Sequence, residues 1–156
     1  MKTWALAITL ASVLFAGSRG VGADRVYLEA AGRNAQTGVA RMTLCLETDK
    51  PLVCFSVKLR AVGERSDLQS AATVLNYVRL PWCDRAVSIE TKGSRLTFNV
   101  ADLSGESAMV TPGAGWVFAL DLPLAADAAP PTIAIEEIKA FDRNGNEVRL
   151  SGGGAR

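Results

Sequence analysis

Few residues of this chain are of the types that catalyse reactions. Its 156 residues include no histidine, so neither a Ser-His-Asp nor a Cys-His nucleophile arrangement can form. Glu136 and Glu137 are adjacent carboxylates, but glycoside hydrolysis requires two carboxylates that face one cleft. Neighbours on a strand face opposite sides, and at a bulge we expect both to face solvent. The sequence therefore predicts a protein that is not an enzyme and that uses no cofactor.

The Asp142-x-Asn144-x-Asn146 stretch has the alternating oxygen ligands of a calcium loop. Its glycine, Gly145, falls between the second and third ligands, and the twelfth loop position would be Gly153, which has no carboxylate. This spacing excludes an EF-hand. Asn144-Gly145 is instead typical of a tight hairpin turn, because both residue types tolerate positive φ. We expect no metal site.

The three cysteines, Cys45, Cys54 and Cys83, allow one disulfide in an exported protein. Alternation of apolar residues points Cys45 and Cys54 outward on successive strands. If those strands lie in opposite sheets, the two thiols are on opposite outer faces and cannot pair. Cys83, in a predicted loop, is then the better partner for one of them, and three free thiols are the alternative. Without histidine or a C-x-x-C pair, zinc is disfavoured.

The first 23 residues have the pattern of a secretory signal peptide. Lys2 precedes an apolar run from Ala5 to Ala16, and Val21-Gly22-Ala23 has the residues of a cleavage site. We expect a signal-peptide helix over residues 1–23 and a secreted or periplasmic mature chain. An uncleaved anchor is the alternative. No other stretch is apolar enough to span a bilayer, so no membrane association is predicted after cleavage.

Residues 24–156 would form one domain with nearly balanced charge. Without Lys2 and Arg19, 15 of the 17 basic residues remain, against 16 acidic residues, for a net charge of about −1. No basic patch is evident in the sequence, and nucleic acid is therefore not an expected partner.

Alternating apolar and polar residues predict strands rather than helices. Leu96, Phe98 and Val100 share one face, and Trp116, Phe118, Leu120 and Leu122 repeat this pattern. Turn residues separate about nine such segments, which indicates an all-β sandwich or jelly roll. The expected strands cover residues 25–31, 38–47, 52–61, 73–79, 86–91, 94–100, a segment starting at Trp116, one starting at Thr132, and 147–150.

Two details of this pattern give further expectations. Ile133 and Ile135 share a face but Ile138 has the opposite parity, so we predict a β-bulge at Glu136-Glu137. Residues 151–156 are rich in glycine, and we expect them to form a flexible tail after a domain spanning residues 24–150.

The second half of the chain resembles cohesin modules. The segments Arg95–Val100, Leu103–Gly105, Thr111–Gly115 and Trp116–Leu122 are similar to the middle of that family. Residues Thr132–Val148, with the turn Asp142-Arg-Asn-Gly-Asn146, are similar to its last two strands, and Gly38–Leu59 to its second and third. The resemblance extends from Val26 to Leu150 and implies a nine-stranded jelly roll related to carbohydrate-binding modules.

The resemblance also implies a function. Cohesins bind dockerin domains and so assemble extracellular complexes that degrade polysaccharide. In that family the third, fifth, sixth and eighth strands form one sheet, and its outer face binds the partner. The residues of this chain that the resemblance places there are Ser56, Lys58, Ser88, Glu90, Arg95, Thr97 and Asn99. A protein partner of the dockerin type is therefore expected. A plain solvated sheet face is the alternative interpretation of these residues.

Two other functions stay open. Exposed aromatic rings can stack on sugars, and Trp82, which follows a proline in a loop, is the main candidate for a carbohydrate-binding module. Trp116 shares parity with Phe118 and Leu120, so we expect it in the core. The third possibility is a structural component of an envelope or matrix that self-associates through an edge strand.

Overall fold

The computed structural model describes residues 24–63, 67–81, 87–102, 104, 107–125 and 128–153, and these residues contain strands and no helix. The predicted signal-peptide helix lies outside the described residues. The strands are β1 (Arg25–Arg33), β2 (Val39–Thr48), β3 (Leu52–Val62), β4 (Ala72–Leu75), β5 (Val87–Lys92), β6 (Arg95–Ala101), β7 (Gly113–Pro123), β8 (Thr132–Asp142) and β9 (Ser151–Gly153).

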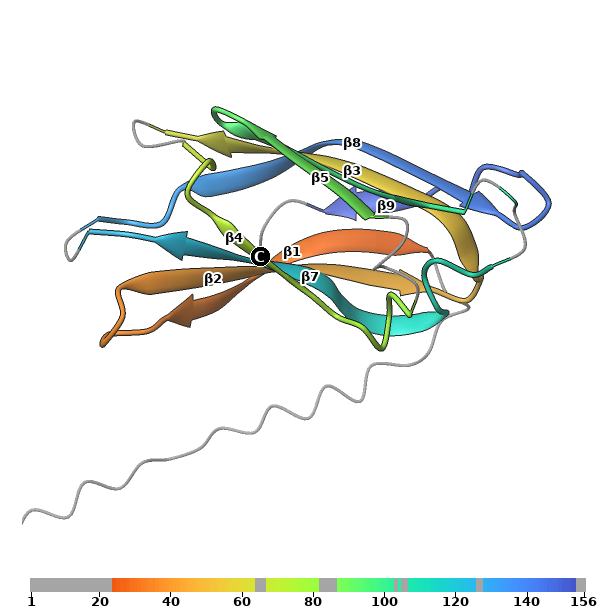
Figure 1. The fold of residues 1–156 in the computed structure, drawn as a ribbon, viewed down its shortest axis with the longest axis horizontal. Helices are drawn as coiled ribbons and strands as arrows, with labels where there is room; N and C mark the ends of the chain where they lie inside the picture. The colour runs from red at the N-terminus through yellow and green to blue at the C-terminus, as the bar shows by residue number, and fades with distance from the viewer. Residues whose placement is uncertain are drawn as a thin grey trace, which may run out of the picture.

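The nine strands form two sheets that pack face to face as a sandwich (Figure 1). One sheet has the strand order β4-β7-β2-β1-β9, and the other has the order β5-β6-β3-β8. The prediction of a nine-stranded all-β sandwich is confirmed. The expected grouping of the third, fifth, sixth and eighth strands in one sheet is also confirmed.

Alternation along β6 shows how the sequence produces this architecture. Leu96, Phe98 and Val100 are buried, while Arg95 is exposed and Thr97 is half-buried. Because successive side chains of a strand point to opposite faces, one set enters the core and the other faces outward.

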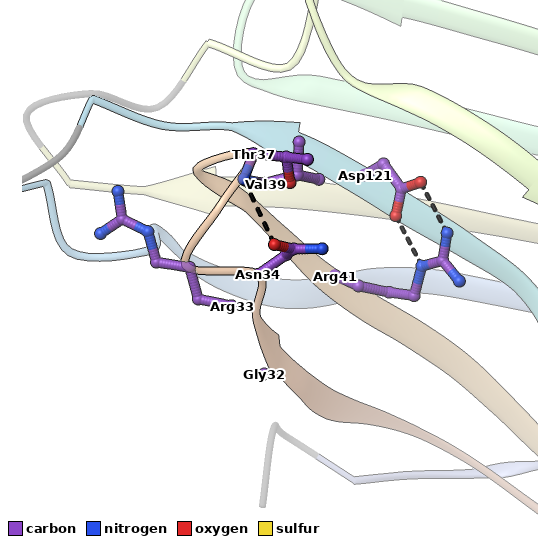
Figure 2. Close-up of a pocket in the computed structure, with 7 residues that line it drawn as sticks. All are labelled: Gly32, Arg33, Asn34, Thr37, Val39, Arg41 and Asp121. Carbon is purple, nitrogen blue, oxygen red and sulfur yellow. Dashed lines mark hydrogen bonds and ion pairs between the residues drawn. The ribbon is translucent and has the colours of Figure 1, made fainter.

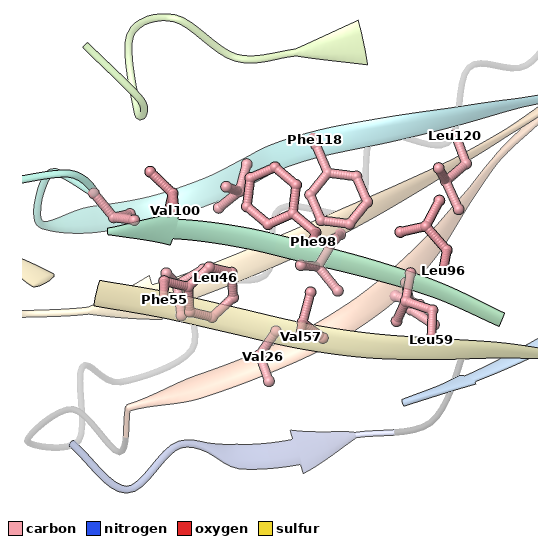
Figure 3. Packing of buried hydrophobic residues seen from close by; sticks show 14 of the residues in the cluster. Val26, Leu46, Phe55, Val57, Leu59, Leu96, Phe98, Val100, Phe118 and Leu120 are labelled. Atoms are coloured by element: carbon pink, nitrogen blue, oxygen red, sulfur yellow. The ribbon is translucent and has the colours of Figure 1, made fainter. Parts of the chain in front are cut away.

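The core is a layer of apolar side chains between the sheets (Figure 3). Phe98 of β6 stacks on Phe118 of β7, with ring centroids 4.5 Å apart, and the Phe55 ring lies 6.3 Å from that of Phe98. All three rings are at most 1% exposed. Full burial of a side chain of this size contributes about 1.5–3 kcal/mol, so this aromatic contact between the sheets is a main source of stability.

The bulge predicted in β8 is present. Lys58 of β3 pairs with Glu137, but the next residue, Leu59, pairs with Ile135, so Glu136 is the extra residue. The inserted residue restores the inward direction of Ile138, which pairs with Val57. It also leaves both Glu136 and Glu137 on the outer side, where they form ion pairs.

A second bulge, in β7, overturns one prediction. Leu44 pairs with Phe118 and Cys45 pairs with Trp116, so Val117 has no partner on β2. The extra residue breaks the parity that placed Trp116 with Phe118. Trp116 shares the outward direction of Cys45 and is 37% exposed, so its assignment to the core is wrong.

The segment expected to be a strand over residues 73–79 is shorter than predicted. Strand β4 covers Ala72–Leu75 and is followed by a turn. The side-chain oxygen of Asn76 accepts a hydrogen bond from the Val78 amide, and its backbone carbonyl accepts from the amides of Arg79 and Leu80. These local hydrogen bonds replace the hydrogen bonds between strands that a longer β4 would make. Asparagine side chains commonly stabilise turns in this way.

That turn carries a buried arginine. Arg79 is 6% exposed, and its Nη2 donates to the Leu46 carbonyl at 3.3 Å. Its Nε and Nη1 atoms have no hydrogen-bond partner in the part of the chain that the structure describes. Burial lowers the pKa of this guanidinium. A Cβ at Gly113 would lie 3.6 Å from Nη1, which is an ordinary van der Waals contact.

The C-terminal segment also differs from the prediction. Residues 147–150 are not a strand, and only Glu147 forms an isolated bridge, with Phe141. Strand β9 instead covers Ser151–Gly153 and pairs in parallel with β1. The flexible tail expected over residues 151–156 stays a prediction, although its first three residues pair with β1. Residues 154–156 lie outside the described part. The glycine-rich composition of this segment gives no sign that the backbone of β1 is available to pair with it.

Candidate binding face

The outer face of the β5-β6-β3-β8 sheet gathers the residues that the cohesin resemblance indicated. All seven lie at outward positions of β3, β5 and β6. We call this surface the polar face, and define it by twelve polar and charged residues at outward positions of its four strands: Ser88, Glu90, Lys92, Arg95, Thr97, Asn99, Ser56, Lys58, Arg60, Glu136, Glu137 and Lys139.

Strand register arranges these residues in rows across the sheet. Lys92, Arg95 and Arg60 lie directly opposite one another on β5, β6 and β3. The next row along the strands consists of Glu90, Thr97, Lys58 and Glu137, and the row after it of Ser88, Asn99, Ser56 and Lys139. Residues far apart in the sequence are thus neighbours on one surface.

Glu137 is the centre of one ion-pair cluster on the polar face. Its carboxylate binds the Lys139 ammonium at 2.7 Å and also the Lys58 ammonium. Hydrogen bonds from Lys139 and then Lys58 lower the pKa of Glu137 to about 2. The same pairing raises the pKa of Lys139. Both partners therefore remain charged across the neutral and mildly acidic range.

Glu136 is shared by two arginines. Its Oε2 accepts from Arg95 Nε at 3.1 Å, and its Oε1 lies 3.6 Å from Arg60 Nη1. One carboxylate thus serves two guanidinium groups, as Glu137 serves two lysines. Exposed pairs of this kind contribute little to stability, so their arrangement matters chiefly for what the face presents to a partner.

A hydrogen bond links two neutral residues in the middle of the face. Ser56 Oγ donates to Asn99 Oδ1 at 2.6 Å. The amide nitrogen of the Asn99 side chain has no hydrogen bond within the described residues. Fixed neutral groups with an available donor suit recognition of a polar partner surface.

Sequence reasoning omitted five residues of this face: Arg60, Lys92, Glu136, Glu137 and Lys139. Continuing the alternation from Lys58 and Glu90 would have found Arg60 and Lys92. The acidic pair could have been placed from the predicted bulge, because one inserted residue leaves both carboxylates outside.

An open depression of about 550 Å³ lies on the polar face, between Lys58, Lys92, Arg95, Glu90 and the two bulge carboxylates. Both bulge carboxylates accept hydrogen bonds from cations there. The chain has no histidine to act as a base beside them. The arrangement can bind charged and hydrogen-bonding groups.

A second hollow, of about 530 Å³, lies beside the turn between β1 and β2 (Figure 2). Arg41 and Asp121 form a bidentate pair in it, with distances of 2.6 and 2.7 Å. Arg33 donates to the carbonyls of Ala125 and Ala128. The charged groups of this hollow are thus engaged within the protein, which indicates a structural role.

The cysteines are arranged partly as expected. Cys45 lies on β2 and Cys54 on β3, in different sheets, and neither forms a disulfide with another described residue. Cys54 is half-buried. Cys45 points to the outer side of its sheet but is only 3% exposed, and its Sγ contacts the side chains of Thr43 and Glu29. Cys83 and Trp82 lie outside the described residues, so a pairing with Cys83 and the sugar-binding role of Trp82 stay predictions.

The turn after β8 is a hairpin-type turn. The Asp142 side chain accepts from the amides of Asn144 and Asn146, each at 2.9 Å, and Gly145 has φ of 75°. Asn144 keeps negative φ, so only the glycine uses the left-handed region. In the described part of the chain, no three His, Cys, Asp or Glu residues gather as a metal site, and no helix there is long and apolar enough to cross a membrane.

The sequence matches no family model and no curated protein, but the fold is similar to solved cohesins. The sixth cohesin of scaffoldin B from Acetivibrio cellulolyticus, in complex with a Cel5 dockerin mutant, has a TM-score of 0.68 at 9% identity, over 86% of this chain and 96% of that one. The OlpA cohesin of Clostridium thermocellum, in complex with a dockerin, has 0.66 at 14%, over 84% and 96%.

A third similar structure is described as a non-cellulosomal cohesin, from the archaeon Archaeoglobus fulgidus. Its TM-score is 0.52 at 11% identity, over 84% of this chain and 88% of that one. At such low identity these likenesses concern the fold and not the partner. Together with the strand order, they show that this chain has a cohesin-like fold.

Proposed function

We propose that this protein is a non-catalytic binding module that recognises a protein partner through its polar face. The observation that carries the proposal is the gathering of Ser56, Lys58, Asn99 and their neighbours on the outer face of the β5-β6-β3-β8 sheet. Two of the similar cohesins were solved in complex with dockerins. A partner of the dockerin type is the first candidate for this chain.

The proposal includes an extracellular or periplasmic setting, which is supported by the signal-peptide pattern of residues 1–23. A link to polysaccharide breakdown is supported only by the cohesin-like fold. The non-cellulosomal label of the archaeal cohesin shows that this fold also occurs outside cellulosomes.

The test is capture of the partner from the culture medium by the immobilised chain, with identification by mass spectrometry. We expect Lys58→Glu or Asn99→Ala to reduce capture by about tenfold, because central interface residues commonly contribute more than 1 kcal/mol. Arg149→Glu and Gln36→Ala are matched controls, since both residues are exposed and lie off the polar face. Undiminished capture by the face variants would contradict the proposal.

A second candidate, carbohydrate binding, is favoured by the exposure of Trp116 on the other sheet. Its side chain is 37% exposed, and Tyr77, in the turn after β4, is 62% exposed. Aromatic rings of this kind can stack on the apolar face of a sugar. The test is retention of the protein on insoluble polysaccharide. Lower retention of the Trp116→Ala or Trp82→Ala variant, with unchanged retention of the Lys58→Glu variant, would favour this function.

A further inference from the structure

One end of the polar face carries three cations side by side. Lys92, Arg95 and Arg60 occupy directly opposed positions on β5, β6 and β3, and we call them the cation row. Neighbouring strands lie about 4.8 Å apart, so the row spans about 10 Å. Like charges directly opposite each other destabilise a sheet. Fold stability therefore does not account for this row.

The cation row is only partly neutralised within the protein. Glu136 forms ion pairs with Arg95, at 3.1 Å, and with Arg60, at 3.6 Å. Among the described residues, none forms an ion pair with Lys92. Three positive charges thus share one carboxylate, and the row lacks two negative charges. The open depression of the polar face is lined in part by Lys92, Arg95 and Glu136.

The excess of positive charge belongs to this face and not to the surface in general. The polar face has the cations Lys58, Arg60, Lys92, Arg95 and Lys139 and the carboxylates Glu90, Glu136 and Glu137. The charged residues along β1, β2 and β7 of the other sheet are Arg25, Arg33, Arg41, Glu29, Glu47 and Asp121, whose charges balance. The two sides of the sandwich are thus electrostatically different.

We infer that the cation row binds an acidic helix of the partner protein that lies across the strands. This inference rests on the proposed function and specifies its partner. One helical turn advances 5.4 Å, and side chains at i and i+4 are about 5–6 Å apart, close to the strand spacing. Two carboxylates one turn apart on such a helix supply the two charges that the row lacks.

The rest of the polar face favours a protein as the source of these carboxylates. The row is continuous with Thr97, Asn99 and Ser56, which are neutral hydrogen-bonding residues. A helix seated on the row brings the adjoining surface of its own protein over these residues. Opposite charge on the two surfaces would also speed association and suppress wrong partners.

The test is an NMR titration of the full mature chain, labelled with ¹⁵N, with two alanine-based helical peptides. One peptide has glutamate at i and i+4, and the other has glutamine at the same positions. We expect the glutamate peptide to shift the amide signals of Lys92, Arg95 and Arg60 and to bind about tenfold more tightly than the glutamine peptide. Raising the salt concentration should weaken the binding of the glutamate peptide, because salt screens the charges.

Variants locate the site. Lys92→Gln combined with Arg60→Gln should reduce the affinity for the glutamate peptide by about tenfold, and Arg149→Gln should leave it unchanged. All three residues are exposed, and unchanged chemical-shift dispersion will show that the variants fold. Equal affinity for the two peptides, or shifts centred on the other sheet, would overturn the inference.

Two further results separate the alternatives. Trigalacturonate is an acidic oligosaccharide that offers carboxylates from a sugar. If it shifts the same amide signals at lower concentrations than the glutamate peptide does, the inference that the carboxylates come from a protein is overturned. If capture of the natural partner depends on Asn99 but not on Lys92 and Arg60, the inference fails while the proposed function stands. If capture depends on neither set, both fail.

Discussion

Trp116 and Cys45 lie opposite each other on β7 and β2, on the outer side of the sandwich, because Val117 is an extra residue in β7. The bulge divides the strand into two segments of opposite parity. Phe118 enters the core, whereas Trp116, two residues earlier, faces outward. This relationship leads to a direct test of the bulge.

We expect Phe118→Ala to be far more destabilising than Trp116→Thr. The buried ring of Phe118 leaves a cavity when it is removed, which costs about 3–5 kcal/mol. Loss of the partly exposed indole should cost at most about 1–2 kcal/mol. Urea unfolding followed by circular dichroism measures both values. Equal losses would mean that Trp116 lies in the core.

Replacing Arg79 by an apolar residue of similar length should not destabilise the protein. Its Nε and Nη1 are buried without a hydrogen-bond partner among the described residues, and such groups cost about 1–3 kcal/mol each to bury. We expect Arg79→Met to raise the free energy of unfolding by about 1–2 kcal/mol. Arg79→Ala should lower it, because it leaves a cavity.

Arg149→Met is the control for this substitution, since Arg149 is exposed and its replacement should change stability by less than about 0.5 kcal/mol. The same urea titrations apply. Destabilisation by Arg79→Met as large as that by Arg79→Ala would show that the guanidinium itself holds the turn in place.

Cys45 and Cys54 should not form a disulfide with each other, because they lie in different sheets. Burial raises the pKa of both thiols. Iodoacetamide reacts with the thiolate form of cysteine. In a Cys83→Ser variant, the labelling rate of Cys45 and Cys54 should therefore keep rising above pH 9. Cys54 should react faster than the more deeply buried Cys45. Peptide mapping by mass spectrometry measures both rates, and a peptide linking the two residues would contradict this arrangement.

Glu137 should stabilise the fold only when it is ionised. Its two lysine partners hold its pKa at about 2, below the ordinary value of 4.5. Because the folded-state pKa is the lower one, its contribution is present above pH 4.5 and is lost as the pH falls towards 2. The difference in unfolding free energy between the wild type and Glu137→Gln should shrink over this range.

The same titration can be followed by ¹³C NMR of the Glu137 carboxyl. Lys139→Met should raise the pKa of Glu137 more than Lys58→Met does, because the Lys139 hydrogen bond is the larger cause of the shift. Lys92→Met, which removes a cation that is not paired with Glu137, is the control. A carboxyl that titrates near its ordinary value in the wild type would exclude the ion-pair cluster in solution.

Prediction from the sequence succeeded where a local pattern fixes the direction of side chains. The alternation in β6 and the parity change around Glu136 were read directly from the order of residues, because strand geometry has a period of two. The bulge in β7 was not found. The small residues before Trp116 have no apolar alternation of their own, so a parity change there leaves no trace in the sequence.

Strand β9 was missed for a different reason. Three residues, Ser151–Gly153, have no side-chain pattern that favours a strand, and their pairing with β1 joins opposite ends of the domain. The backbone of Ser151 donates to the Asp24 carbonyl at 3.0 Å. Such a contact exists only once the rest of the sheet has formed.

The amino-acid sequence by itself determined the two-layered all-β architecture, the inward set of apolar residues and the lack of a histidine-based catalyst, because these depend on residue type and local periodicity. Only the tertiary structure decided which charges are neighbours. Lys92, Arg95 and Arg60 come from three strands, and Glu136 reaches two of them from a fourth. Cross-strand register sets these distances, and register is a property of the assembled sheet.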